Sequence, residues 1–167
     1  LHAASQAPET ARHAIGAAEL AAALKAGDVT VIDLSLSRNY LAAHIPGAWF
    51  AIRARLDRAL AKLPASGTLV LTSEDGRLAA LAEPELRTLT KSPVRVLTGG
   101  NAAWRDAGHP LTSADPHMAD DAIDAWLKPY ERSANVEKAM AEYLSWEVDL
   151  LPRIARSYAL HFAQAEL

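Results

Sequence analysis

The sequence contains no cysteine among its 167 residues. Disulfides, thiolate metal sites and thiol nucleophiles are therefore excluded, and with them every mechanism in which a protein thiolate carries the reacting group. The sequence also lacks an uninterrupted apolar run of the roughly 18 residues that a transmembrane helix requires. We therefore expect a protein that does not rely on disulfides and does not span a membrane.

An excess of basic residues is also absent. Lys and Arg number 17 against 20 Asp and Glu, so the formal net charge is −3. Binding to nucleic acid requires concentrated positive charge, and we therefore expect no nucleic-acid partner. The six histidines include no pair at metal-ligand spacing on one helix, so we expect neither a metal site nor a cofactor.

Short runs of β-branched and apolar residues indicate strands that are buried on both faces of a parallel sheet. These runs cover residues 29–34, 68–72 and 94–97. Between and before them, apolar residues recur at helical spacing over residues 17–26, 37–43, 52–63 and 77–89, with Pro84 expected to bend or divide the last helix. Strands that alternate with helices predict right-handed crossovers and helices on both faces of the sheet.

Strand signals disappear from about residue 120 onward. Residues 120–128 and 133–166 have a helical pattern throughout. We therefore predict an α/β domain over residues 1–115, with its core at about 15–112, and a C-terminal helical extension over residues 116–167. Large aromatic side chains make this extension a candidate interaction element, namely Trp126, Tyr143, Trp146 and Tyr158.

Three segments, in order along the chain, resemble the rhodanese homology family. Residues 31–35, 40 and 44–48 resemble its V-I-D-V-R…Y…G-H-I-P-G-A pattern. Residues 69–79 occupy the place of its active-site loop, C-x-x-G-x-R-S, and residues 96–110 are similar to its L-x-G-G-x-x-x-W…G-x-P pattern. The resemblance implies a rhodanese-like three-layer α/β/α fold with a central parallel sheet. Since the chain begins without Met, we expect it to be part of a longer, tandem-rhodanese protein.

The resemblance also implies sulfur transfer, in which a cysteine thiolate takes a sulfane sulfur from a donor such as thiosulfate and holds it as a persulfide. Aligned on Gly76, the cysteine position falls on Ser73 and the loop arginine on Leu78, while Ser35 stands where the family has another arginine. A serine hydroxyl is essentially un-ionised at neutral pH unless a base activates it. We therefore expect no catalytic residue, and a vestigial active-site loop made of Ser73, Glu74, Asp75, Gly76, Arg77 and Leu78.

Other readings of individual residues are weaker. Ser73 with His44 as its base would give a hydrolase or phosphatase, but no G-x-S-x-G elbow surrounds Ser73 and the resemblance places His44 in a structural turn. Asp33, at the end of a strand, is expected to cap a turn. Trp104 is expected to anchor its helix in the core.

We therefore predict a rhodanese-like domain of a thiosulfate sulfurtransferase that is itself inactive in persulfide chemistry and serves a structural or regulatory role. Two alternatives stay open: an active parent protein with catalysis in another domain, or a pocket that binds a small anion without reaction. The expected partners are other rhodanese domains of the same polypeptide, or a second copy that binds through the C-terminal helices. The expected location is the cytoplasm.

Overall fold

The computed structural model describes residues 13–65 and 67–125, together with residues 137, 138, 140, 141, 144, 145 and 148. The chain divides into two compact units, residues 1–125 and 126–167. The first unit thus includes residues 116–125, which the sequence-based division assigned to the C-terminal extension. The described residues of the second unit are helical, while the aromatic side chains of the predicted interaction element lie outside the described residues. In the part of the chain that the structure describes, no helix has the length and apolar character needed to cross a bilayer.

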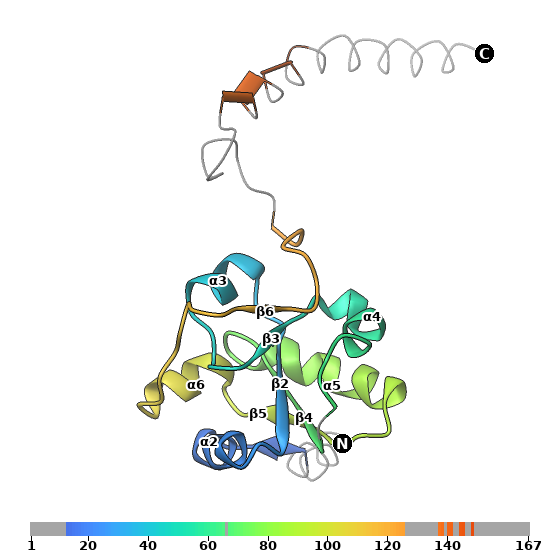
Figure 1. The fold of residues 1–167 in the computed structure, drawn as a ribbon, viewed down its shortest axis with the longest axis vertical. Coiled ribbons are helices and arrows are strands. Elements are labelled where there is room, and N and C mark those ends of the chain that lie inside the picture. The colour runs from blue at the N-terminus through green and yellow to red at the C-terminus, as the bar shows by residue number, and fades with distance from the viewer. Residues whose placement is uncertain are drawn as a thin grey trace, which may run out of the picture. The chain divides into compact units, whose positions relative to one another are not determined.

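A six-stranded parallel sheet forms the middle of the first unit (Figure 1). Its strands lie in the order β1-β5-β4-β2-β3-β6. Their bounds are β1 (Ala14–Ile15), β2 (Val29–Asp33), β3 (Trp49–Phe50), β4 (Thr68–Thr72), β5 (Val94–Leu97) and β6 (His117–Met118). The sequence pattern identifies β2, β4 and β5 but not the others, because a strand of two residues is too short to show a period.

Helices cover both faces of the sheet, as predicted (Figure 1). One face carries α2 (Ala17–Ala26), α3 (Ser37–Ala42) and α6 (Gly100–Asp106), and the other carries the 3-10 turn η1 (Arg53–Arg55), α4 (Leu56–Leu60) and α5 (Arg77–Leu89). The helix α5 runs through Pro84 as one element, so Pro84 does not divide it. Ala80 and Pro84 are both exposed, so water can bond to the Ala80 carbonyl that the missing N–H leaves free.

Alternation along the central strands produces two apolar cores. On β2, Val31 packs under α2, α3 and α6, whereas Ile32 packs under α4 and α5. On β4, Val70 and Leu71 divide between the same two cores. Trp104 is 3% exposed and its indole N–H donates to the Pro110 carbonyl at 2.8 Å, which confirms its role as a core anchor. The three-layer α/β/α fold is therefore confirmed.

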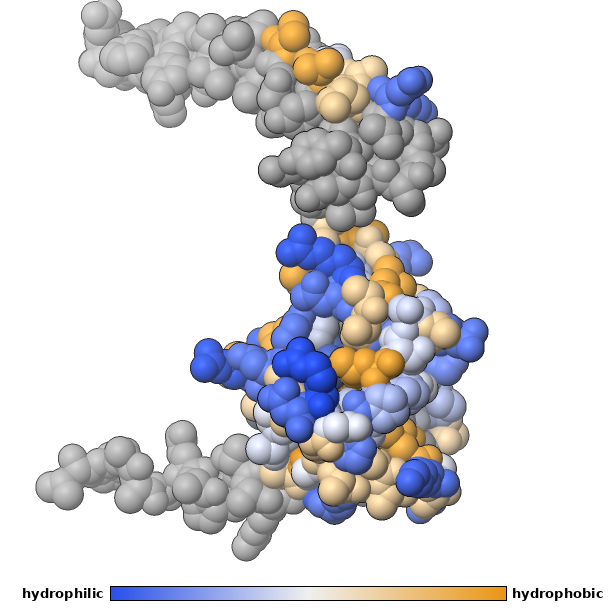
Figure 2. Space-filling model, turned by 90° about the vertical axis from the view of Figure 1, so that its left-hand side faces the viewer, coloured by the Kyte–Doolittle hydropathy of each residue, from blue (hydrophilic) through white to orange (hydrophobic). Residues whose placement is uncertain are grey.

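The surface of the first unit mixes polar and apolar residues. Figure 2 views it from the side of α2, α3 and α6, where hydrophilic and hydrophobic residues are interspersed. Its large apolar side chains that are exposed are Leu36, Leu41, Leu81, Leu89 and Ile123. Singly exposed leucines are normal on soluble domains, so any binding role must be argued from a site rather than from exposure.

The helix predicted over residues 120–128 is wrong in its described part, because residues 120–125 form bends after β6. One Asp120 oxygen, Oδ2, accepts the backbone N–H of Ile52 at 2.8 Å. Asp124 Oδ2 accepts the N–H of Ser37 at 2.7 Å. These long-range bonds to other segments override a weak local helical pattern.

Candidate functional site

The predicted 73–78 loop lies beside the point where the strand order reverses: residues 73–76 connect β4 to α5, and Arg77 and Leu78 begin α5. The strand β2 pairs with β3 on one side and with β4 on the other. Ser73 is the first residue after β4, and Gly76 directly precedes α5. Open α/β sheets bind ligands in the crevice at the carboxyl ends of such strands. The structure therefore gathers the predicted loop residues at the place where this architecture favours a site.

Glycines allow the loop to pack against the start of α6. Gly76 and Gly100 have φ values of 80° and 62°, in the left-handed region. A Cβ on Gly100 would lie 2.1 Å from the Ser73 carbonyl oxygen. That oxygen accepts the N–H of Asn101 at 2.8 Å, and the next carbonyl of the loop accepts the N–H of Ala102 at 3.0 Å. The backbone of the loop is thereby fixed on α6.

Asn101 links three strand ends through a buried polar network. Its Nδ2 donates to Asp33 Oδ2 at 2.8 Å and to Ser35 Oγ at 3.2 Å, and its Oδ1 accepts the Thr72 hydroxyl at 2.8 Å. Asp33 Oδ1 accepts the Ser35 N–H at 2.9 Å, so the prediction that Asp33 caps a turn is confirmed. The sequence analysis did not identify Asn101. Like Asp33 at the end of β2, Asn101 lies close to the carboxyl end of a parallel strand, and this position could have predicted its place in the site.

The Asp33 carboxyl group is the buried acid of this network. Burial raises its pKa, while the bonds from Ser35 and Asn101 lower it and the nearby Glu74 carboxylate raises it further; the net direction is upward. A carboxyl group whose pKa is raised on folding contributes to stability in its protonated form, and this contribution is complete only at pH values below the ordinary pKa of 3.8. That contribution is lost as the pH rises through the folded-state pKa, while the hydrogen bonds from Ser35 and Asn101 act in the opposite direction and favour the ionised form.

Replacing Asn101 by alanine should lower the unfolding free energy at neutral pH by about 1–3 kcal/mol, because it leaves the buried Asp33 carboxyl group and the Thr72 hydroxyl without a partner. The pKa of Asp33 should rise further, so the loss should shrink at pH values below 3.8. Urea unfolding at the two pH values measures both effects. Thr88→Ala is the matched control, because the Thr88 hydroxyl donates to the backbone carbonyl of Glu85, which does not titrate, and its loss should be the same at both pH values. An equal loss at both pH values would show that Asp33 is not the group affected.

Ser73 lies at the start of the loop with its hydroxyl turned toward α5. It is only 1% exposed, and its Oγ accepts the Ala79 N–H at 3.3 Å. His44 is not positioned as its base: Nδ1 of His44 bonds to the Tyr40 carbonyl oxygen at 2.8 Å and its ring stacks on Tyr40. The hydrogen bonds of the described residues include none between Ser73 and His44. The structural role expected for His44 is therefore confirmed.

Side chains of the loop itself occupy the N-terminus of α5. Asp75 Oδ1 accepts the N–H of Arg77, the first residue of α5, at 3.0 Å. The Arg77 guanidinium lies 3.3 Å from the other oxygen of the same carboxylate, and both side chains are largely exposed. Together with the bond from Ala79 to Ser73, this satisfies two first-turn N–H groups internally. An added anion would also meet the negative charge of Asp75.

Glu74 extends from the loop to the segment that follows β2. Its Oε1 accepts the Leu36 N–H at 3.2 Å and an Asn39 Nδ2–H at 2.8 Å. Partial burial acts to raise the pKa of Glu74, but the hydrogen bonds from Asn39, from Leu36 and within the loop outweigh it, and the net pKa is lowered. Glu74 is therefore an anion at neutral pH and adds a second negative charge to the loop.

Replacing Glu74 by glutamine should destabilise the domain at neutral pH and have little effect in acid. Because the folded-state pKa is lowered, the contribution of the carboxylate is present above the ordinary value of 4.5 and is lost as the pH falls through the folded-state pKa. Urea unfolding of both proteins across this range measures the difference. A gap between the two proteins that widens in acid would contradict the assigned contacts.

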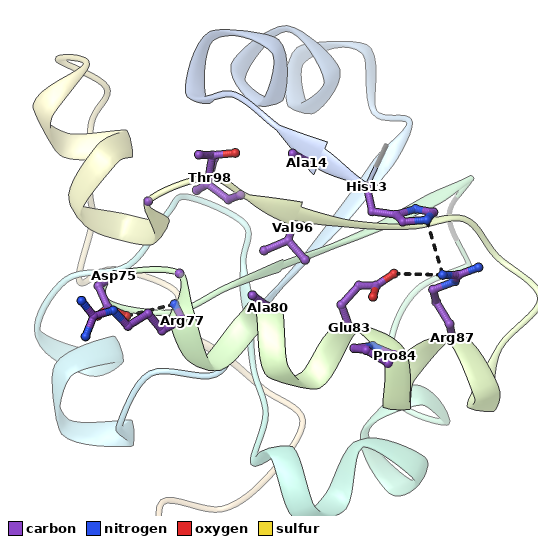
Figure 3. A pocket seen from close by; sticks show the side chains of 13 residues that line it. His13, Ala14, Asp75, Arg77, Ala80, Glu83, Pro84, Arg87, Val96 and Thr98 are labelled. Atoms are coloured by element: carbon purple, nitrogen blue, oxygen red, sulfur yellow. Dashed lines mark hydrogen bonds and ion pairs between the residues drawn. The ribbon is translucent and has the colours of Figure 1, made fainter. Parts of the chain in front are cut away.

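A cavity of about 640 Å³ lies between α5 and the strands β5 and β1. Figure 3 shows Ala80 and Val96 in its middle, with Asp75 and Arg77 at one end. At the other end, Arg87 Nη1 lies 3.4 Å from His13 Nε2 and 3.6 Å from Glu83 Oε1 (Figure 3). The polar groups at each end thus interact mainly with one another, and the middle is apolar.

A second cavity, of about 490 Å³, opens at the carboxyl end of β2, and we call it the β2 cavity. Ser35 and Leu78, which stand at the two arginine positions of the family pattern, both line it. Its other lining residues are Leu34, Leu36, Ala51, Ile52, Arg53, Ala54, Glu85 and Asp124. Among the described residues, no group of three or more His, Cys, Asp or Glu side chains gathers as a metal site.

Comparisons with known proteins agree with this architecture. The family model for the rhodanese-like domain matches residues 16–107. A thiosulfate sulfurtransferase from Pseudomonas aeruginosa is 36% identical, with a TM-score of 0.80 over 86% of this chain. The match covers 27% of that protein, so this chain spans only a part of such a relative.

Other solved structures match the fold at lower identity. The rhodanese-like domain of an Anabaena protein is 27% identical, with a TM-score of 0.54 over 69% of this chain and 92% of that one. A 3-mercaptopyruvate sulfotransferase from Escherichia coli is 23% identical, with a TM-score of 0.53 over 70% of this chain and 56% of that one, a likeness of fold alone. Among curated proteins, no match was found.

Proposed function

Because the chain belongs to the rhodanese-like domain family, we propose that it is a sulfurtransferase-type domain that does not itself carry sulfur and serves a structural or regulatory role. The observation that carries the proposal is Ser73, which stands at the nucleophile position of the loop in a chain without cysteine. A persulfide forms on a thiolate, and a buried hydroxyl with no base beside it cannot replace that thiolate.

The surroundings of Ser73 support the same proposal. Glu74 and Asp75 place two carboxylates on the loop, and an anionic donor such as thiosulfate would be repelled by both. Leu78 lines the β2 cavity in place of the arginine of the family pattern. The loop therefore lacks the nucleophile and also opposes the charge of the substrate.

An assay of sulfur transfer from thiosulfate to cyanide tests the proposal. The chain should give the rate of the uncatalysed reaction, and Ser73→Ala should give the same rate. The P. aeruginosa thiosulfate sulfurtransferase serves as the positive control. Turnover well above background that Ser73→Ala abolishes would overturn the proposal.

The role that remains for such a domain is binding to another domain. We propose other rhodanese domains of the same polypeptide as its partners, or a second copy through the C-terminal helices, and a parent protein whose sulfur transfer takes place elsewhere. The 27% coverage of the P. aeruginosa relative is consistent with a longer parent. Light scattering of the chain with and without residues 126–167 tests self-association. Loss of the parent's activity on deletion of this domain tests the regulatory role.

A pocket that holds a small anion without reaction is the alternative function. Calorimetric titration with thiosulfate, sulfate and phosphate tests it, and saturable heat at millimolar ligand would favour it over a purely structural role. A cytoplasmic location is part of our proposal, and cell fractionation followed by detection of the parent protein tests it.

A further inference from the structure

We propose that the β2 cavity binds an alkylammonium group, such as the side chain of a lysine, with its carbon stem on the leucines of the wall and its charge at Asp124. The cavity offers a mainly apolar wall and one acidic group, Asp124, that has no counter-charge among the lining residues. Binding of a cation in this cavity is independent of sulfur transfer. The binding test and the sulfur-transfer assay can therefore give opposite outcomes.

The wall of the cavity is suited to a hydrocarbon chain. Leu34 is buried and Leu78 is half-buried, while Leu36 is 41% exposed and forms part of the rim. Burial of apolar surface contributes roughly 25 cal/mol per Å². A stem of several methylene groups would cover leucine surface that is otherwise in water.

The charges of the lining leave one carboxylate without a counter-charge. Arg53 and Glu85 form a two-point ion pair, in which Arg53 Nε lies 2.9 Å from Glu85 Oε2 and Arg53 Nη2 bonds to Oε1. They neutralise each other at the edge of the cavity. Asp124 is the remaining charged residue of the lining, so the lining carries a net negative charge.

Asp124 supplies the acceptor for a cation. Its Oδ2 accepts the Ser37 N–H at 2.7 Å, but its Oδ1 is buried and has no hydrogen-bond partner among the residues that the structure describes. A buried charged acceptor without a donor is costly and calls for an ion or water that satisfies it. An ammonium group supplies both the N–H donors and the positive charge.

The same cavity disfavours the ligand class that the family pattern would suggest. With Ser35 and Leu78 at the arginine positions, no cation of the wall is free to meet an anion, because Arg53 is engaged with Glu85. An anion would also approach the unpartnered oxygen of Asp124. The cavity therefore favours a cationic ligand in two ways: it attracts the positive charge and it repels anions that would compete for the same place.

Titration with n-butylammonium, followed by backbone amide shifts in heteronuclear NMR, tests this site. We expect saturable shifts at Leu36, Ile52 and Leu78, and much weaker shifts with n-butanol, which has the same stem without the charge. Asp124→Asn keeps an oxygen for the Ser37 N–H but removes the charge, and it should weaken binding at least about tenfold. Asp121→Asn, which alters an exposed carboxylate outside the cavity lining, should leave binding unchanged.

A second variant and a second ligand complete the test of the β2 cavity. Leu78→Arg places a cation in the wall and should abolish n-butylammonium binding, which decides the matter if Asp124→Asn fails to fold. A short peptide with one central lysine distinguishes the two sources of the ammonium group. If the natural ligand is a protein, the peptide should bind more tightly than n-butylammonium; if it is a free amine, the peptide should not. Equal binding of n-butanol, undiminished binding to both variants, or saturable shifts with thiosulfate alone would overturn the proposal.

Discussion

Replacing Gly100 by alanine should cost the first unit more than about 4 kcal/mol of unfolding free energy and leave much of it unfolded. The Cβ would lie 2.1 Å from the Ser73 carbonyl oxygen and 2.4 Å from the Gly76 nitrogen. Both are backbone atoms of the packed loop, and the carbonyl is held by the Asn101 N–H. The φ of 62° adds strain for any residue with a Cβ.

Urea unfolding followed by circular dichroism measures this loss. Gly16→Ala is the matched control, because Gly16 has a φ of −82° and a Cβ there would have no atom within 4 Å. We expect the unfolding free energy of the control to stay within about 0.5 kcal/mol of that of the unaltered chain, as is usual for surface substitutions. Similar unfolding midpoints for the two variants would contradict the close approach of the 73–78 loop to α6.

Replacing Ser73 by cysteine should not by itself create an efficient sulfurtransferase. The variant would have the missing thiol, yet Asp75 and Glu74 would still oppose an anionic donor and Leu78 would still stand at an arginine position. Loss of one well-placed donor to a developing anion costs roughly 10²–10³ in rate. We therefore expect Ser73→Cys to stay at least about a hundredfold below the P. aeruginosa thiosulfate sulfurtransferase in the thiosulfate-to-cyanide assay.

A double variant identifies the cause of that shortfall. Ser73→Cys with Leu78→Arg should be faster than Ser73→Cys alone, because the added guanidinium can meet the anionic donor. Leu78→Arg with Ser73 retained is the control and should stay at background. If Ser73→Cys alone transferred sulfur as fast as the relative, the loop would be intact and the missing thiol its sole defect.

The sequence predicts the fold well where burial leaves a mark in the pattern. The strands β2 and β4 are buried on both faces and β5 is buried at its two ends, so they appear as short apolar, β-branched runs. The strands β1, β3 and β6 contain two residues each and leave no such mark. The helix expected over residues 120–128 is absent from its described part, residues 120–125, because Asp120 and Asp124 bond to distant backbone N–H groups, which no local pattern records.

The candidate site is predictable in position and less so in detail. Motif spacing places Ser73 and Gly76 at the turn into α5, and the structure agrees. The partners of Glu74 lie in another segment of the chain, at Leu36 and Asn39, and could not be inferred from the loop alone. The place of Asn101 in the site could have been predicted, because polar residues that follow parallel strands meet at one edge of the sheet.

Intact mass spectrometry of the chain after incubation with thiosulfate shows directly whether Ser73 can hold a sulfur atom. We expect an unchanged mass, because a serine hydroxyl cannot hold a sulfane sulfur as a thiolate does. The P. aeruginosa thiosulfate sulfurtransferase under the same conditions shows whether the method would detect an adduct. A mass increase of one sulfur atom on the unaltered chain, mapped to Ser73, would contradict the account.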